Sequence, residues 1–399
     1  MISKKIYEFI GGIFIILLPF QDVFLQNTPL GYLGANLSFL MIPFMLLIFF
    51  FNIIKAKKIR RNDFILLLSL LLLLLFSSFN YFVNVSFKND QTRVIEGVKL
   101  IIICFFSIFP IVYFSQNKMD NLKPFLTIAL LIVILGVLVS DYLSLEFIGI
   151  LHQQEYWNSR PRGFSTESSL LGATVGIIIA LYFSTVTWRS NHIFTIIIFV
   201  AIFFTGSKGA IFSMFLSYGL LELRRMKLNI NTLIVIILGT LSFIFIVAQA
   251  INTLMIDIEK YTSFATRTSL IIASINSAIN NPFGLGFWGY YGQGKVYILQ
   301  ALELTKSNTR EIETIVRTGV NYSFKTGLGD ALVIGGIPIV VFCLCKLKKM
   351  SKQCDNYYLK LSMLFSIISL STYVSFLGFY VITLPFIFVL QDIKFKDIK

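Results

Sequence analysis

Leu66–Phe76 reads LLLSLLLLLLF, and Ile193–Phe204 reads IFTIIIFVAIFF. Each segment is apolar apart from a single hydroxyl residue, and neither alternates polar with apolar positions as a strand of a membrane barrel does. A run of about 20 apolar residues crosses a bilayer as a helix, because a helix satisfies its backbone polar groups internally. These segments therefore predict an all-α membrane protein.

The composition of the whole chain agrees with that prediction. Of its 399 residues, 56% are hydrophobic and 14% are charged, whereas soluble domains contain roughly 45–50% apolar and about 25% charged residues. The net charge of +14 is better explained by orientation in a membrane than by binding to nucleic acid. The four cysteines fall outside the expected external loops, so they predict no disulfide framework.

About a dozen apolar segments divide the chain, so we expect a polytopic protein of about 12 transmembrane helices in one multispan domain, residues 1–399. Lysine and arginine concentrate in the loops on the side of the two termini. The orientation rule therefore places both termini in the cytoplasm and the protein in the cytoplasmic (inner) membrane. The expected spans are Ile6–Phe20, Leu33–Ile54, Phe64–Val83, Val98–Phe114, Phe125–Ser140, Ser169–Trp188, Ile193–Thr205, Ala210–Leu223, Thr232–Leu254, Leu328–Cys345, Leu359–Val374 and Phe376–Leu390.

Two polar stretches fall on the outer face in this arrangement. The longer one, Met255–Lys325, makes up the large external loop, which we assign to residues 255–327, and it carries Arg267. The shorter one, His152–Glu167, contains the sequence RPRG at positions 160–163. Basic residues normally concentrate on the cytoplasmic side. Their presence here indicates an anionic ligand at the outer level of the bilayer.

Four basic side chains are the candidates for binding that ligand. Guanidinium groups bind phosphate oxygens bidentately, so a pyrophosphate at the headgroup level suits them. The alternative is that they only contact anionic headgroups or extend along the membrane surface. The candidate residues are Arg160, Arg162, Lys208 and Arg267. Lys208 belongs to a Gly-Ser-Lys-Gly interruption between two apolar segments, either a tight external turn or a broken helix lining a cavity.

Glu167 is the candidate catalytic residue. It stands where the sixth span begins, after Ser165 and Thr166, either of which is a suitable helix cap. A carboxylate beside guanidinium groups at a helix N-terminus stays ionised and can accept a proton from a sugar hydroxyl. The alternative is that Glu167 only caps the helix and pairs with Arg162.

Other polar positions give weaker signals. Leu270–Ile279 predicts a short amphipathic helix. The segment Asn280–Gly292, which mixes glycines with aromatic residues, suits a turn that presents rings to a sugar or to the membrane interface. Asp330 is either a functional acid within the membrane or a helix cap. Asp257 and Glu259 have the spacing of an acidic metal motif, but we expect them to be solvated and expect no metal site.

Several of these elements, in the same order, resemble the Wzy-type family of bacterial O-antigen and capsule polymerases, which is related to the O-antigen ligases. The resemblance covers about Arg160 to Pro338. The elements that carry it are Arg160-Pro-Arg-Gly-Phe with Glu167-Ser-Ser before a span, Thr205-Gly-Ser-Lys-Gly-Ala210, Arg267 ahead of Asn281-Pro-Phe-Gly-Leu-Gly-Phe287, and the glycine-rich segment Gly327–Gly336.

The resemblance implies a glycosyltransferase with a glycosyltransferase-C-like fold. Such an enzyme transfers a growing glycan from its polyprenyl pyrophosphate carrier onto a lipid-linked repeat unit, with no metal, cofactor or nucleotide sugar. It implies that Glu167 activates the acceptor hydroxyl and that the basic residues stabilise the leaving pyrophosphate. The implied partners are the polyprenyl-pyrophosphate-linked oligosaccharide and membrane lipids, with a chain-length regulator and a flippase as candidates.

The chain departs from the family pattern at Lys208, where the family has Arg, so charge is kept but the bidentate fork is lost. The related ligases carry a histidine in the large external loop, and this chain has none between residues 255 and 327. That absence favours a polymerase over a ligase. A flippase or another transporter for lipid-linked oligosaccharides and a non-enzymatic scaffold are the further alternatives.

Overall fold

The structure is a computed structural model of the chain, and it describes part of the residues. These are residues 4–27, 35–56, 68, 72, 91–114, 119, 121–145, 147–148, 150–152, 160–186, 191–225, 262–305, 323–375 and 379–394. The expected span Thr232–Leu254 lies outside them, and so does Phe64–Val83 apart from residues 68 and 72.

The described residues form helices joined by turns, without a named strand, which confirms the all-α prediction for this part of the chain. Short 3₁₀ turns cover Phe24–Asn27, Leu37–Leu40 and Tyr380–Thr383, and a π turn, Leu138–Tyr142, extends α5. The α-helices are α1 Lys4–Leu17, α2 Met41–Ala56, α4 Gln91–Phe114, α5 Leu122–Val137, α6 Ser168–Ser184, α7 Asn191–Phe204, α8 Lys208–Arg225, α10 Thr262–Asn280, α11 Gly286–Thr305, α13 Gly327–Gln353, α14 Tyr357–Thr372 and α15 Leu384–Lys394.

Three helical stretches in the described part of the chain are long and apolar enough to cross a membrane: Leu37–Ile54, Leu122–Tyr142 and Gly327–Gln353. The first of them, in α2, exposes Leu47 and Ile54 with relative accessibilities of 67% and 75%. A helix with an exposed apolar face of this kind is expected to contact lipid rather than water. These helices are compatible with a membrane protein, while the number of about 12 spans stays a prediction.

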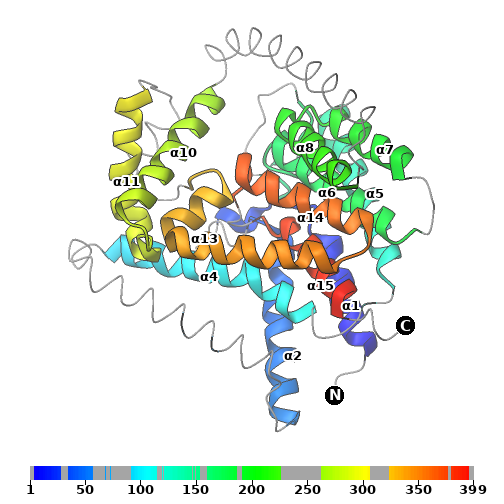
Figure 1. Ribbon diagram of the computed structural model, residues 1–399. Coiled ribbons are helices and arrows are strands. Elements are labelled where there is room, and N and C mark those ends of the chain that lie inside the picture. Colours follow the sequence, from blue (N-terminus) through cyan, green and yellow to red (C-terminus); the bar gives the residue numbers. More distant parts are fainter. Residues whose placement is uncertain are drawn as a thin grey trace.

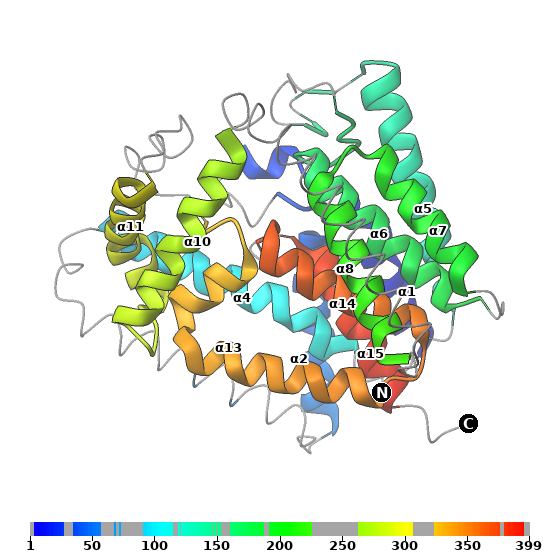
Figure 2. The ribbon, with the colours of Figure 1, turned by 45° about the horizontal axis from the view of Figure 1, so that its top comes forward.

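The helices pack into two groups (Figures 1 and 2). In the larger group α6 lies against α5, α7, α8 and α14. In the smaller group α10 and α11 form a hairpin that packs on α13 and on one end of α4. Helix α4 belongs to both, because Leu100 and Cys104 enter the smaller apolar core whereas Ile103 and Phe109 enter the larger one. The described part of the expected external loop is therefore largely helical.

Helix α13 is interrupted at Gly336, whose φ of 66° lies outside the helical region. In an unbroken helix the Ile337 amide would donate to the Val333 carbonyl, four residues earlier. Here the Ile337 amide donates to the Pro282 carbonyl at 2.9 Å, and the Val333 carbonyl accepts from the Leu285 amide at 2.7 Å. The turn at the tip of the α10–α11 hairpin thus satisfies both groups that the interruption frees, which a buried backbone requires.

This hairpin corrects one expectation about aromatic residues. The rings of Asn280–Gly292 were expected at a turn, facing a sugar or the membrane interface. Instead Phe287, Trp288, Tyr290 and Tyr291 belong to α11 and are buried, with exposures between 0% and 9%. These rings fill the smaller core. They therefore hold the hairpin in place and do not face a sugar or the membrane interface. The expected amphipathic helix Leu270–Ile279 is confirmed within the longer α10.

Candidate functional site

The candidate site centres on the contact between Glu167 and Arg267, which stand 100 positions apart in the sequence. The Arg267 Nη2 atom lies 3.7 Å from the Glu167 Oε1 atom, and the two side chains keep accessibilities of 25% and 48%. The Ser169 hydroxyl also donates a hydrogen bond to Glu167. Glu167 precedes α6 of the larger group, and Arg267 lies in α10 of the smaller one. The ion pair therefore joins the two groups of helices, with both side chains still open to a ligand.

The cap of α6 differs from the expected one. Ser165 and Thr166 were the expected caps, with Glu167 in the first turn. Instead Glu167 is the N-cap residue itself, in an extended conformation with φ −152° and ψ 160°, and its side chain makes no capping hydrogen bond. Its carboxylate is turned to Ser169 and Arg267, so the alternative in which Glu167 pairs with Arg162 is wrong.

Arg160 and the segment of Lys208 meet at the turn between α7 and α8. A Cβ atom on Gly206, in that turn, would lie 3.5 Å from the Arg160 Cγ atom. Lys208 is the first residue of α8 and is exposed. The Gly-Ser-Lys-Gly interruption is thus a tight turn between two helices, the first of its two expected alternatives, and it brings Arg160 close to the start of α8.

Tyr373 is a neighbour of the site that sequence reasoning missed. It follows α14 directly and is buried, at 4% exposure. Its ring lies 3.0 Å from the point where a Cβ atom on Gly209 would stand. It interacts electrostatically with both Arg267 and Glu167. Tyr373 therefore connects the start of α8 with the ion pair. A single tyrosine at the end of an apolar segment offers no signal by which the sequence could have revealed this role.

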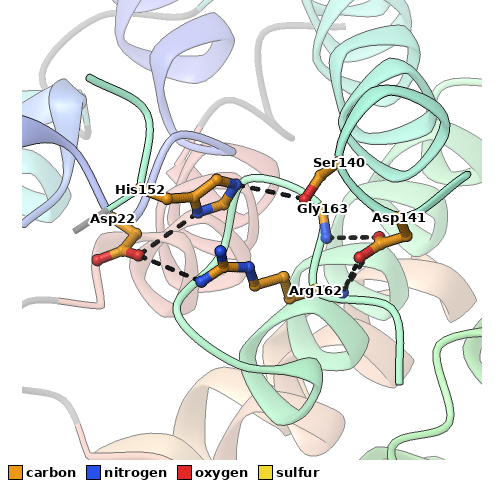
Figure 3. A network of polar contacts seen from close by, with 6 residues as sticks. All are labelled: Asp22, Ser140, Asp141, His152, Arg162 and Gly163. Atoms are coloured by element: carbon orange, nitrogen blue, oxygen red, sulfur yellow. Dashed lines mark hydrogen bonds and ion pairs between the residues drawn. The ribbon is translucent and has the colours of Figure 1, made fainter. Parts of the chain in front are cut away.

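Arg162 has a different environment from the other three basic candidates (Figure 3). It is buried at 2% exposure, and its Nη1 atom lies 3.8 Å from the Asp22 Oδ2 atom. The same Asp22 oxygen lies 3.4 Å from Nδ1 of His152, whose Nε2 atom is 3.5 Å from the Ser140 hydroxyl. The Arg162 guanidinium is thus directed to a carboxylate inside the protein. Removing one partner from a buried ion pair costs about 3–5 kcal/mol.

The segment between Arg160 and Glu167 is also held through its backbone. The amides of Arg162 and Gly163 donate to the Asp141 carboxylate at 3.0–3.2 Å (Figure 3). Gly163 adopts a positive φ of 54°, a backbone conformation that glycine reaches without steric cost. Phe164 packs where a Cβ atom on Gly136 would stand, 2.7 Å away. Contacts to α5 and to the π turn after it thus fix the path of the segment.

Asp330 forms a separate and fully buried polar centre. Its carboxylate accepts hydrogen bonds from the Tyr290 hydroxyl at 2.5 Å, the Ser375 hydroxyl at 2.5 Å and the Phe324 amide at 3.0 Å. Thr326, not Asp330, caps α13, so the cap alternative for Asp330 is wrong. Asp330 ties α11 and α13 to the segment after α14, two residues beyond Tyr373.

Two acidic residues that the sequence analysis considered, Asp257 and Glu259, lie outside the described residues. Within the described ranges, no group of three or more His, Cys, Asp or Glu residues is placed to hold a metal ion. The structure thus brings Glu167, Arg267 and Tyr373 together and places Arg160 near the start of α8. The Arg162 side chain instead pairs with Asp22.

The chain is similar to an uncharacterized 49.5 kDa protein in the cps region of Klebsiella pneumoniae. The two are 26% identical over 302 residues, which cover 71% of this chain and 69% of that protein. No protein-family model matches the chain. No solved structure matches it either.

Proposed function

We propose that this protein is a polysaccharide polymerase of the cytoplasmic membrane of a bacterium. It transfers a glycan from a polyprenyl pyrophosphate carrier onto a lipid-linked repeat unit at the outer face, in the synthesis of O-antigen, capsule or exopolysaccharide. The observation that carries the proposal is the contact between Glu167 and Arg267, because it sets a carboxylate beside a guanidinium with both still accessible. The similarity to a protein encoded in a cps (capsule) region supports a place in polysaccharide synthesis.

In this reaction the acceptor sugar hydroxyl attacks the anomeric carbon of the donor glycan. The bond from that carbon to the pyrophosphate oxygen breaks, and polyprenyl pyrophosphate leaves with the bonding electrons. Glu167 accepts the proton of the attacking hydroxyl, since its exposed carboxylate has room for the acceptor. Arg267, Arg160 and Lys208 bind the pyrophosphate and stabilise the charge that develops on it. The leaving group is already activated, so no general acid, metal or cofactor is required in this proposal.

The electrostatic arrangement suits this division of roles. Arg267 lies 3.7 Å from the Glu167 carboxylate, and it has further donors for a second anion, because a guanidinium carries five N–H groups. Tyr373 is buried and interacts electrostatically with both side chains. We assign Arg162 to the support of this site rather than to the diphosphate.

The proposed arrangement in the membrane is a glycosyltransferase-C-like bundle of about 12 spans with both termini in the cytoplasm. The proposed partners are the lipid-linked oligosaccharide, a flippase that delivers it and a chain-length regulator. A flippase or transporter is the second candidate function. The buried group of Asp22, His152 and Arg162 favours it, because ionisable residues inside transporters often mark a transport path.

Analysis of lipid-linked glycans in a deletion strain tests the proposal against its alternatives. A strain without this protein is expected to accumulate single repeat units on the outer leaflet, because the repeats are delivered but not joined. Finished polymer retained on its carrier would instead indicate a ligase. Repeat units confined to the inner leaflet would indicate a flippase. Polymer of normal length in the deletion strain would reject all three.

A further inference from the structure

Three consecutive residues after α1 contact the segment that carries Arg160 and Glu167. The Phe20 ring stacks on the Phe164 ring, with centroids 5.0 Å apart and an interplanar angle of 24°. The backbone amide of Gln21 donates a hydrogen bond to the backbone carbonyl of Phe164 at 3.0 Å. The Asp22 carboxylate pairs with Arg162 at 3.8 Å. Phe20–Asp22 thus supply a ring contact, a backbone hydrogen bond and an ion pair to positions 162 and 164.

The ion pair is the charged contact of the three, and removing only one of its partners would leave the other charge buried without compensation. Asp22, Arg162 and His152 have exposures of 5%, 2% and 0%. Burying charged groups is costly unless opposite charges compensate them. Asp22 lies opposite Arg162 and the Asp141 carboxylate also attracts it, so the ion pair with Asp22 helps to set the path of the segment.

That path determines where the neighbouring side chains lie. Arg160 is two residues before Arg162 and lies against the turn at Gly206 instead of entering the buried cluster. Glu167 is five residues after Arg162, at the N-cap of α6. With Arg162 tied to Asp22, and the amides of Arg162 and Gly163 tied to Asp141, the backbone between Arg160 and Glu167 has little freedom.

The geometry points to Asp22 as a positioning residue of the site, acting through Arg162 on Arg160 and Glu167. This inference rests on the proposed function insofar as it concerns catalysis, and it extends that function to the end of the first helix. Asp22 touches no substrate in this account. Arg162 is its partner and binds no pyrophosphate.

The test combines labelling with a double-mutant cycle over Asp22→Asn and Arg162→Gln. A cysteine introduced at Thr166, in a background with Cys343 and Cys345 replaced by serine, reports the mobility of the segment through its rate of reaction with a maleimide. A cysteine at Glu303, exposed near the end of α11, serves as the matched control. The double variant removes both charges of the Asp22–Arg162 pair, so it keeps the test open if a single variant fails to fold.

Asp22→Asn is expected to raise the labelling rate at position 166 at least about fivefold. The rate at position 303 is expected to stay unchanged, because the loss of the ion pair loosens only the segment around Arg162. The rate of polymerisation is expected to fall about tenfold in each single variant. It is expected to fall no further in the double variant, because both substitutions remove the same Asp22–Arg162 ion pair. Labelling at the wild-type rate would overturn the inference. Turnover losses that multiply, or an Asp22→Asn variant with full activity beside an inactive Arg162→Gln, would overturn it as well.

The labelling measurement needs no enzymatic activity, so the two proposals can fail separately. Faster labelling at position 166 in a protein that never polymerises would reject the proposed function and keep Asp22 as the anchor of the segment. Polymerisation by the wild type, with labelling that does not respond to Asp22, would keep the function and reject the anchor.

Discussion

At the scale of single residues, two arginines of one short motif have different environments. Arg160 and Arg162 are equivalent in the sequence RPRG, and both were expected to bind pyrophosphate. The structure buries Arg162 against Asp22 and leaves Arg160 partly exposed beside Gly206. The sequence could not show which of the two is buried, because the carboxylate that pairs with Arg162 belongs to Asp22, 140 positions earlier. The contact between Glu167 and Arg267 was not predicted either, because an expected position at the same level of the membrane does not say which side chains meet.

Glu167→Gln tests the role of the carboxylate as a base. Glutamine keeps the shape of the side chain but cannot take up the proton of the acceptor, so turnover is expected to fall by roughly 10²–10⁴. Binding of the lipid-linked donor is expected to change little, because the pyrophosphate contacts remain. Single-turnover transfer and donor retention by the purified protein measure the two effects. Glu303→Gln is the matched control, and wild-type turnover in Glu167→Gln would exclude this base.

At the scale of elements, the apolar segments of the sequence predicted where helices lie, but they did not predict where a helix is interrupted. The expected spans Val98–Phe114, Ile193–Thr205 and Leu359–Val374 correspond to α4, α7 and α14, because a long apolar run has few other ways to bury its backbone. The break in α13 was not predicted. It depends on backbone pairing with the tip of the α10–α11 hairpin, about 50 positions away, and such a contact leaves no local pattern.

Gly336→Ala tests the docking of that hairpin on α13. Residue 336 has a positive φ, and a Cβ atom there would stand 2.1 Å from the Pro282 carbonyl oxygen. With φ 66° and ψ −168°, the backbone conformation is nearly restricted to glycine and costs an alanine about 1–3 kcal/mol. The clash adds to this cost, so we expect a lower midpoint of thermal unfolding.

Gly219→Ala, inside α8, is the matched control. No atom lies within 4 Å of the added methyl group, and alanine favours helix by about 1 kcal/mol over glycine. Its midpoint is therefore expected to stay the same or rise. Equal midpoints for Gly336→Ala and the wild type would contradict the docked arrangement.

At the scale of the whole molecule, the proposed function requires the end of α11 and the C-terminal end of α13 to face opposite sides of the membrane. Glu303, in α11, is expected outside and Lys352, in the last turn of α13, is expected in the cytoplasm. Cysteines at these exposed positions report the side through a maleimide that does not cross the membrane. Burial, followed by the nearby Asp392, raises the pKa of Cys354 to about 12. The native thiol therefore contributes little labelling.

In intact cells with Cys343 and Cys345 replaced by serine, the cysteine at position 303 is expected to react. The cysteine at position 352 is expected to react only after the membrane is opened. The reverse pattern would place the candidate site in the cytoplasm, where flipped lipid-linked repeats are absent, and would remove the basis of the proposed function.

The most direct measurement is polymerisation by the purified protein in lipid discs, supplied with a polyprenyl-pyrophosphate-linked repeat unit. The wild type is expected to produce a ladder of joined repeats. Arg267→Ala is expected to reduce the rate by roughly 10²–10³, because it removes a charge-stabilising donor. Lys295→Ala, which removes another cation from the same hairpin, is expected to leave the ladder unchanged. A normal ladder from Arg267→Ala, or no ladder from the wild type, would contradict the account.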